Sequence, residues 1–159
     1  MGTPSLNKIS GEILIRQFSP SDLDRIIELE NISFQADSFS EATFKDYYHK
    51  CPDLFVVAEM SGVIVGYMIT CVVSEKALVV SVAVDPGCRR KGIGSALAKS
   101  TFNRLSASGV RTVELRVRTT NTEGRRFWEN LKFLPVTAIP HFYSDGAEAL
   151  HMERVLGGF

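Results

Sequence analysis

A strand, a turn and the start of a helix follow one another in Val82-Ala83-Val84-Asp85-Pro86-Gly87-Cys88-Arg89-Arg90-Lys91-Gly92-Ile93-Gly94-Ser95. In this order, the main-chain N–H groups of the turn and the positive end of the helix converge and can bind an anion. Gly92 and Gly94 lack a Cβ, so a ligand can come close to the main chain. The three cations at 89–91 add side-chain charge for phosphate groups. The stretch therefore predicts a phosphate site rather than a plain strand–helix connection with a solvated basic corner.

Two common phosphate-binding patterns do not fit this stretch. The P-loop requires Gly-x-x-x-x-Gly-Lys-Ser/Thr, which the chain does not contain. The dinucleotide fingerprint requires a third glycine, but that position, counted from Gly92 and Gly94, is Leu97. We therefore exclude both nucleotide-binding classes.

Length and composition predict one globular domain in residues 12–159, preceded by a loose tail in residues 1–11. The chain has 159 residues, and its 45% hydrophobic and 23% charged residues are typical of a globular protein. Its formal net charge is zero, whereas a nucleic-acid-binding domain is usually basic, so the cations at 89–91 indicate a local site. The sequence indicates neither a signal peptide nor a membrane span, which favours a cytoplasmic protein without a membrane partner. Both a monomer and a homodimer are compatible with the sequence.

The cysteines Cys51, Cys71 and Cys88 give an odd count without Cys-x-x-Cys spacing. We therefore expect neither a disulfide framework nor a zinc site, and no other metal site is indicated. Such cysteine usage is typical of a reducing cytoplasm. Cys88 lies beside the basic cluster, so its thiol would be reactive if it is exposed.

Hydrophobic periodicity predicts strands interleaved with helices, which indicates a mixed α/β domain. Strands are expected at 12–18, 54–60, 63–73, 76–84, 112–118, 133–136 and 150–155. Helices are expected after Ser19, after Ser40, between Gly92 and Gly109, and after Asn121, since these residues suit helix ends. The loop at 35–39 could line a substrate groove. The residues expected to face inward from the first three helices are Leu23, Ile26, Ile27, Phe34, Phe44, Tyr47, Tyr48, Ile93, Leu97 and Leu105.

Three motifs resemble those of the GNAT family of N-acetyltransferases, and most closely its RimI-like and archaeal members, which acetylate protein N-terminal amines. Residues 89–94 match the acetyl-CoA-binding pattern Arg/Gln-x-x-Gly-x-Gly/Ala. Residues 115–121 and 127–133 are similar to the family's Leu-Glu-Val-Arg-x-x-Asn and Leu-Tyr-x-x-x-Gly-Phe motifs, and residues 143–152 to its Tyr-Tyr-x-x-Asp-Gly tail. The resemblance implies a mostly antiparallel sheet of six to seven strands, flanked by about four helices.

The resemblance also implies acetyl-CoA as the cofactor. The main chain of Val82, Ala83 and Val84 would pair with the pantetheine arm, and one N–H there would stabilise the oxyanion. Asn121 would contact the cofactor arm or, equally well from its spacing, only cap its helix. The pyrophosphate would be bound by Arg89, Arg90, Lys91, Gly92, Ile93, Gly94 and Ser95.

Two positions that usually supply the base and the acid in RimI-like enzymes are changed in this chain. The glutamate of Leu-Glu-Val-Arg is Arg116, which stays charged near neutral pH, and the usual tyrosine is Trp128, which is no practical proton source. We expect Glu114, on the same strand face as Arg116, and Tyr143 to be catalytic. Arg116 and Tyr143 are expected to bind substrate, although Arg116 could instead pair with a carboxylate. His151 is a further candidate, although a lone histidine in a strand more often has a structural role.

The expected activity is acetyl transfer from acetyl-CoA to a primary amine, namely the N-terminal amine of a protein or peptide. The alternative acceptor is a small amine such as a polyamine, an amino acid or an aminoglycoside. A polyamine would need an acidic groove, which Glu28, Glu30, Asp37 and Glu41 could line. The other alternative is a non-catalytic acyl-CoA-binding module, since the phosphate loop is intact while two usual catalytic positions are changed. Nucleic acid is not expected as a partner.

Overall fold

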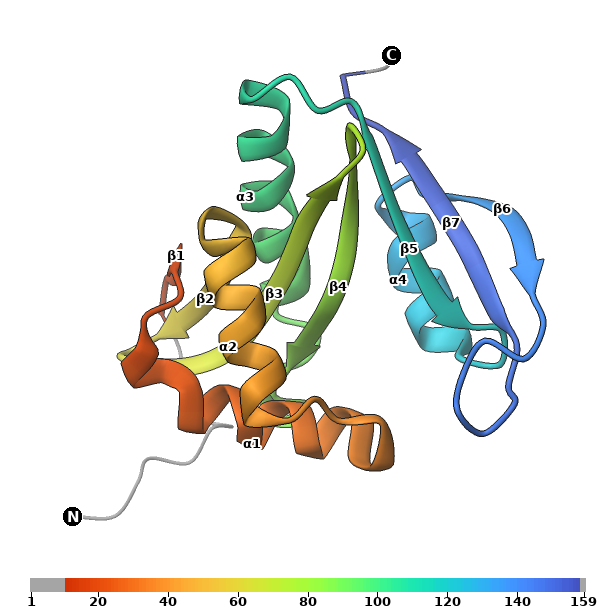
Figure 1. Ribbon diagram of the computed structural model, residues 1–159. Helices are drawn as coiled ribbons and strands as arrows, with labels where there is room; N and C mark the ends of the chain where they lie inside the picture. The colour runs from red at the N-terminus through yellow and green to blue at the C-terminus, as the bar shows by residue number, and fades with distance from the viewer. Residues whose placement is uncertain (1–10, 158–159) are drawn as a thin grey trace. The chain divides into compact units, whose positions relative to one another are not determined.

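The computed structural model describes residues 11–157, so almost all of the expected tail at 1–11 lies outside the described residues (Figure 1). These residues form a mixed, mostly antiparallel sheet of seven strands in the order β1-β2-β3-β4-β5-β7-β6, together with four helices. This confirms the expected α/β fold class. The strands are β1 (Ile13–Gln17), β2 (Phe55–Met60), β3 (Val63–Val73), β4 (Lys76–Val84), β5 (Thr112–Arg118), β6 (Leu134–Ile139) and β7 (Ala149–Val155). The helices are α1 (Leu23–Phe34), α2 (Glu41–Lys50), α3 (Ile93–Ala107) and α4 (Thr122–Asn130).

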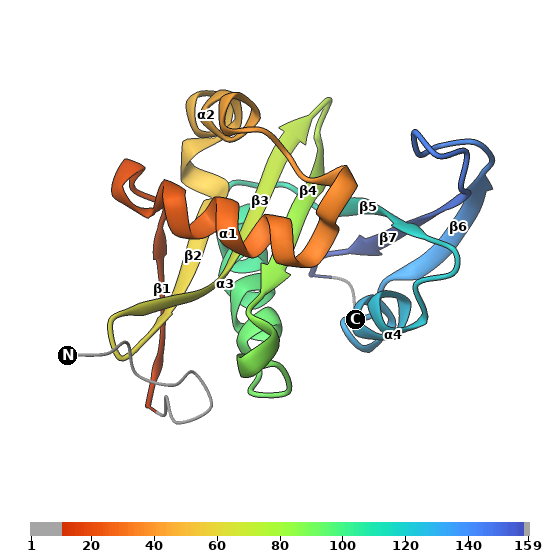
Figure 2. The same cartoon turned by 90° about the horizontal axis from the view of Figure 1, so that it is seen from below.

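The chain forms two compact units. Unit 1 contains residues 80–104 and the described residues up to 71, and unit 2 contains residues 72–79 and the described residues from 105 onward. In unit 1, α1 and α2 cover one face of β2, β3 and β4, and α3 covers the opposite face (Figure 2). None of the helices in the described part of the chain is long and apolar enough to cross a membrane.

Aromatic and aliphatic side chains from α1, α2 and the strands form the core of unit 1. Phe44, Phe55 and Tyr67 are fully buried, and their ring centroids lie 6.0 to 6.4 Å apart. Helix α1 contributes Ile26, as expected, and Leu29. The expectation that Phe34 faces inward is wrong, since it is 38% exposed. Phe34 is the last residue of α1, and the positive φ of the next residue turns the chain away there. The expected residues that pack against this core while only partly buried are Leu23, Ile27, Tyr47 and Tyr48.

A glycine in β3 allows close packing of the first turns of α3. A Cβ at Gly66 would lie 3.1 Å from the carbonyl oxygen of Ala83, 3.2 Å from Ile93 Cγ2 and 3.3 Å from Leu97 Cδ1. Such contacts are tighter than side chains normally make, so any larger residue would displace α3 or β4. Gly66 thus helps to place the loop that joins β4 to α3.

Strand β5 is central to unit 2. Its buried residues Val113, Leu115 and Val117 alternate with Glu114 and the arginines at 116 and 118, as the sequence predicts. It pairs in parallel with the start of β4, where Leu78 lies opposite Glu114, and antiparallel with β7. Helix α4 lies on one face of β5, β7 and β6, and its Trp128 is buried (Figures 1 and 2).

Strand β6 forms one edge of the sheet, and five of its six residues are exposed. Leu134 and Val136 are 70% and 56% exposed. The pairing of β6 with β7 is irregular between Pro135 and Thr137. The strand therefore contributes little to the buried core of unit 2.

Cys51 and Cys71 form a disulfide, with their Cα atoms 5.5 Å apart. The expectation of a chain without disulfides is therefore wrong. An odd cysteine count excludes only complete pairing, and here the third cysteine, Cys88, is free and buried. Cys51 caps the C-terminal end of α2 and Cys71 lies in β3, so the bond ties α2 to the sheet of unit 1.

Reduction of this disulfide should lower the free energy of unfolding. Cys51 and Cys71 are 20 residues apart, and a crosslink across a loop of that size stabilises a fold by about 3 kcal/mol, chiefly by restricting the unfolded chain. Urea unfolding with and without a reductant measures the difference, and the double variant Cys51→Ser with Cys71→Ser should show no response to reductant. Equal unfolding midpoints in both conditions, with three free thiols in the unreduced unfolded chain, would show that the bond does not form.

Candidate active site

The predicted phosphate loop begins at a buried ion pair. Asp85 follows the last residue of β4, and its Oδ1 accepts a 2.8 Å hydrogen bond from the N–H of Gly87. Its Oδ2 lies 2.6 Å from the guanidinium of Arg25 in α1. Arg25 also donates to the carbonyl oxygen of Ile64 at 3.0 Å. Because Asp85 is buried and both of its oxygens are occupied, the chain leaves β4 in one fixed direction.

The loop from 89 to 92 exposes both its cations and its main chain. Arg89, Arg90 and Lys91 are exposed, and α3 begins where the N–H of Ala96 donates to the carbonyl oxygen of Gly92 at 3.0 Å. Arg90 and Gly92 have φ angles of 65° and 78°, so the main chain turns twice through the left-handed region. A Cβ at Gly92 would meet nothing within 4 Å. This open, cationic turn at a helix N-terminus has the features of an anion site.

The thiol of Cys88 is buried and lacks the reactivity expected of an exposed thiol. Burial is the main cause that raises the pKa of its thiol, and the nearby carboxylate of Asp85 raises it further. The thiolate is the nucleophilic form, so the native protein has an unreactive thiol at this position.

A buried polar network in unit 1 was not foreseen from the sequence. Glu30 of α1 accepts hydrogen bonds from the hydroxyl of Tyr67 and, at 3.0 Å, from that of Ser81. Its other oxygen accepts from the N–H of Phe39 at 3.3 Å. Burial raises the pKa of Glu30, while these three donors act in the opposite direction. The network connects α1, the segment before α2 and strand β4 just before Val82.

These contacts weaken the expectation of an acidic groove. Glu30 is buried, Glu28 lies 3.0 Å from Arg25, and Glu41 lies 3.0 Å from Lys45. Three of the four acids are therefore engaged within the protein. A polycationic acceptor would have to displace these partners.

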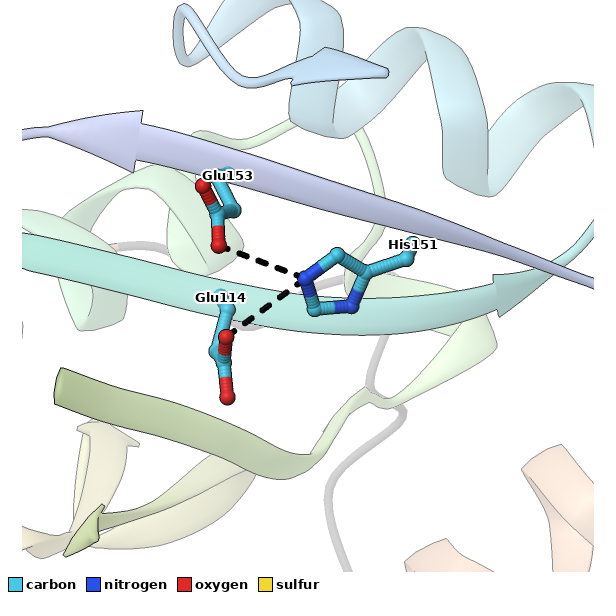
Figure 3. A group of neighbouring side chains, drawn as sticks. All are labelled: Glu114, His151 and Glu153. Atoms are coloured by element: carbon cyan, nitrogen blue, oxygen red, sulfur yellow. Dashed lines mark hydrogen bonds and ion pairs between the residues drawn. The ribbon is translucent and has the colours of Figure 1, made fainter. Parts of the chain in front are cut away.

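In unit 2, Glu114 lies beside His151 (Figure 3). His151 Nε2 is 3.4 Å from an oxygen of Glu114 and 3.4 Å from an oxygen of Glu153. The same oxygen of Glu153 accepts a 3.1 Å hydrogen bond from Lys76 Nζ. The hydrogen bond from Lys76, with a smaller contribution from His151, holds the pKa of Glu153 below its usual range. The structure thus joins the expected base candidate Glu114 to His151, which could be foreseen only once the register of β5 and β7 was known.

The other predicted site residues of unit 2 have separate environments. Arg116 is exposed and forms no ion pair among residues 11–157, so it is available to an acidic substrate group. Trp128 packs against Phe133, with ring centroids 5.2 Å apart, and belongs to the core. The ring of Tyr143 lies 4.2 Å from the guanidinium carbon of Arg118.

Asn121 caps α4. Its side-chain oxygen accepts a 2.9 Å hydrogen bond from the N–H of Gly124, which confirms the expected helix cap. A contact between Asn121 and the cofactor stays a prediction.

The three features that carried the sequence argument thus have structural counterparts: the open loop at 89–92, the face of β5, and the loop that holds Tyr143. Residues 23–133 match the acetyltransferase (GNAT) family. The chain belongs to the GNAT acetyltransferase family. It is therefore an N-acetyltransferase, and acetyl-CoA is the cofactor that this family uses. The open main chain at Gly92 and the three exposed cations fit the pyrophosphate of that cofactor.

Similar proteins extend over most of the chain. An uncharacterized N-acetyltransferase of Methanocaldococcus jannaschii is 31% identical over 141 residues, which cover 88% of this chain and 90% of the relative. An N-alpha-acetyltransferase of Sulfurisphaera tokodaii is 28% identical over 158 residues and covers 91% of this chain and 94% of its own length. The crystal structure of Ard1 from Thermoplasma volcanium superposes with a TM-score of 0.88 at 30% identity, covering 92% of this chain and 99% of that one. These three proteins support the expected resemblance to archaeal members of the family.

Proposed function

We propose that this GNAT enzyme acetylates the N-terminal α-amine of a protein or peptide. The observation that carries the proposal is the similarity to the N-alpha-acetyltransferase of Sulfurisphaera tokodaii, which extends over nearly the whole of both chains. Similarity of that extent includes the segments on which an acceptor would rest as well as the cofactor loop. We place the reaction in the cytoplasm, where nascent N-termini become available, although the Cys51–Cys71 disulfide removes cysteine usage as an argument for this compartment.

The cofactor would be held by residues of unit 1. The N–H groups from Arg89 to Ser95 would bind the pyrophosphate. The resemblance to the family implies that the main chain of Val82, Ala83 and Val84 in β4 would pair with the pantetheine and hold the acetyl carbonyl. An N–H fixed in a strand costs little reorganisation when an oxyanion forms, which is the basis of its stabilising effect.

The acceptor would be recognised by residues of unit 2. Arg116 is a free cation on β5 and would attract an acidic side chain close to the acceptor amine. The ring of Tyr143, held against Arg118, would line the binding site of the peptide. Acetyl-CoA supplies the acyl group, and the chain's own residues bind, orient and deprotonate the amine.

A peptide library tests the proposal. Peptides with free N-termini, half of them carrying Asp or Glu at the second or third residue, are incubated with the protein and acetyl-CoA, and the products are measured by mass spectrometry. We expect acetylation of α-amines but not of lysine ε-amines, with a preference for the acidic peptides. Turnover of polyamines alone would contradict the proposal and favour the small-amine alternative. Binding of acetyl-CoA without turnover of any amine would favour the acyl-CoA-binding alternative.

A further inference from the structure

The register of unit 2 places an imidazole beside the position of the missing glutamate. Arg116 stands where RimI-like enzymes carry the glutamate taken as the general base. Residue 116 of β5 pairs directly with His151 of β7. Directly opposed residues of an antiparallel pair lie on the same face of the sheet and within side-chain contact. An imidazole therefore lies next to the position that has lost its carboxylate.

His151 is held toward Glu114 by its surroundings. Its Nε2 lies between Glu114 and Glu153 (Figure 3), and Lys76 donates a hydrogen bond to the same oxygen of Glu153. The other ring nitrogen is buried and has no hydrogen-bond partner among the described residues. The polar contacts of the ring are thus confined to the two carboxylates, which fixes its orientation.

Glu114 is more accessible than the histidine that it contacts. Its side chain is 20% exposed, whereas that of His151 is 11% exposed. One oxygen faces His151, and the other accepts no hydrogen bond from residues 11–157. Glu114 lies at the last residue pair between β4 and β5, where these strands stop pairing. One carboxylate oxygen is therefore free to accept a proton from a bound group.

A metal ion is a weaker interpretation of the same three residues. Their ligand atoms lie within 4.8 Å of one another, which would permit coordination. The ammonium of Lys76 already lies 3.1 Å from Glu153, however, and supplies a positive charge at that position. A divalent cation would have to displace it or share a carboxylate with it.

We propose that Glu114, positioned by His151, is the proton acceptor that replaces the missing glutamate. This inference rests on the proposed function. The bound ammonium, R–NH3+, transfers one proton to the free oxygen of Glu114 and becomes the neutral amine R–NH2, whose lone pair can then attack an acyl group. His151 is a positioning residue, which holds Glu114 through the N–H at Nε2, and the proton accepted by Glu114 then passes to solvent. Three charged residues lie beside His151, namely Glu114 and Arg116 of β5 and Glu153 of β7. Lys76 of β4 contacts Glu153. Strand β6, on the other side of β7, has no titratable residue.

The test compares kcat/KM against pH for the native enzyme, Glu114→Gln and His151→Gln, using the best peptide. Loss of a general base should lower kcat about 100-fold at pH 7 in Glu114→Gln, with the KM for acetyl-CoA unchanged. His151→Gln should lower kcat about 10-fold at pH 7 and show the same dependence on pH as Glu114→Gln, since His151 acts through Glu114. Both deficits should shrink above about pH 8, where the α-amine loses its proton without help. Glu129→Gln and His49→Gln, at exposed positions on α4 and α2, serve as matched controls and should behave as the native enzyme does.

Deficits of the same size at every pH would overturn the inference, because they would indicate a structural effect. If either variant fails to fold, the native profile decides alone. A native kcat/KM that rises tenfold per pH unit up to the pKa of the amine would show that no protein base acts, whereas a flat profile from neutral pH supports the inference. Loss of activity in EDTA with recovery in zinc would overturn the inference in favour of a metal. Absence of turnover with every amine would instead overturn the proposed function, on which the inference depends.

Discussion

Gly92→Glu is expected to abolish acetyl-CoA binding while the fold survives. The main chain at Gly92 is open to solvent, and a carboxylate there would occupy the place of a phosphate and repel it. We expect the dissociation constants of acetyl-CoA and CoA to rise at least about 100-fold, or about 2.8 kcal/mol. Calorimetric titration of both ligands measures the loss, and circular dichroism confirms the fold.

Gly62→Glu provides a matched control for this substitution. Gly62 has a φ of 79°, against 78° at Gly92, and a Cβ there also meets nothing within 4 Å. The two variants therefore carry the same charge change and the same backbone strain, but Gly62 lies in the turn between β2 and β3. Gly62→Glu should bind acetyl-CoA as the native protein does. Equal binding by Gly92→Glu would mean that the loop serves only as a helix start.

Tyr67→Ala should have the largest effect on stability. Tyr67 is fully buried and contacts the rings of Phe44 and Phe55, so its removal leaves a large cavity. It also removes a donor from the buried carboxylate of Glu30. Together these changes should lower the free energy of unfolding by about 5 kcal/mol, a large part of the stability of a typical domain. Urea unfolding followed by fluorescence measures the difference.

Tyr67→Phe separates the hydrogen bond from the packing. The ring stays, so the expected loss at neutral pH is about 2 kcal/mol, the size of a hydrogen bond to a charged group. Burial already raises the pKa of Glu30, and removal of a donor to its charged form raises that pKa further. A group with a raised folded-state pKa stabilises the fold at low pH and loses that contribution as the pH rises through this value. The deficit of Tyr67→Phe should therefore be largest at neutral pH and shrink on acidification.

The half-buried Tyr48 provides the control for the hydroxyl. Among residues 11–157 it forms no hydrogen bond to a buried carboxylate, so Tyr48→Phe should change stability by less than about 0.5 kcal/mol at any pH. A Tyr67→Phe deficit that does not depend on pH would contradict the role given to Glu30.

Local sequence patterns were sufficient for most of the fold. Cap residues such as Ser40 and Asn121 begin α2 and α4 as expected, and their side chains accept the hydrogen bonds that define a cap. The phosphate loop was also predictable, because strand, turn, cations and helix are contiguous in sequence. Phe34 was misplaced because periodicity alone does not show where a helix leaves the core.

The long-range contacts of the site were not accessible from the sequence. The disulfide joins residues 20 positions apart, and Glu30 reaches Ser81 across 51 positions. Both contacts depend on how helices pack onto the sheet. His151 and Glu114 were each noticed as candidates, but their pairing depends on the register of β5 and β7, which hydrophobic alternation does not specify.

The exposed edge strand β6 affects how the molecule behaves at high concentration. An open sheet edge with apolar residues such as Leu134 and Val136 is a template on which a strand of another copy could add and start an aggregate. Pro135 has no N–H to offer such a strand, and the irregular pairing at Thr137 distorts the edge. These two features protect the protein against edge-to-edge polymerisation without burying the strand.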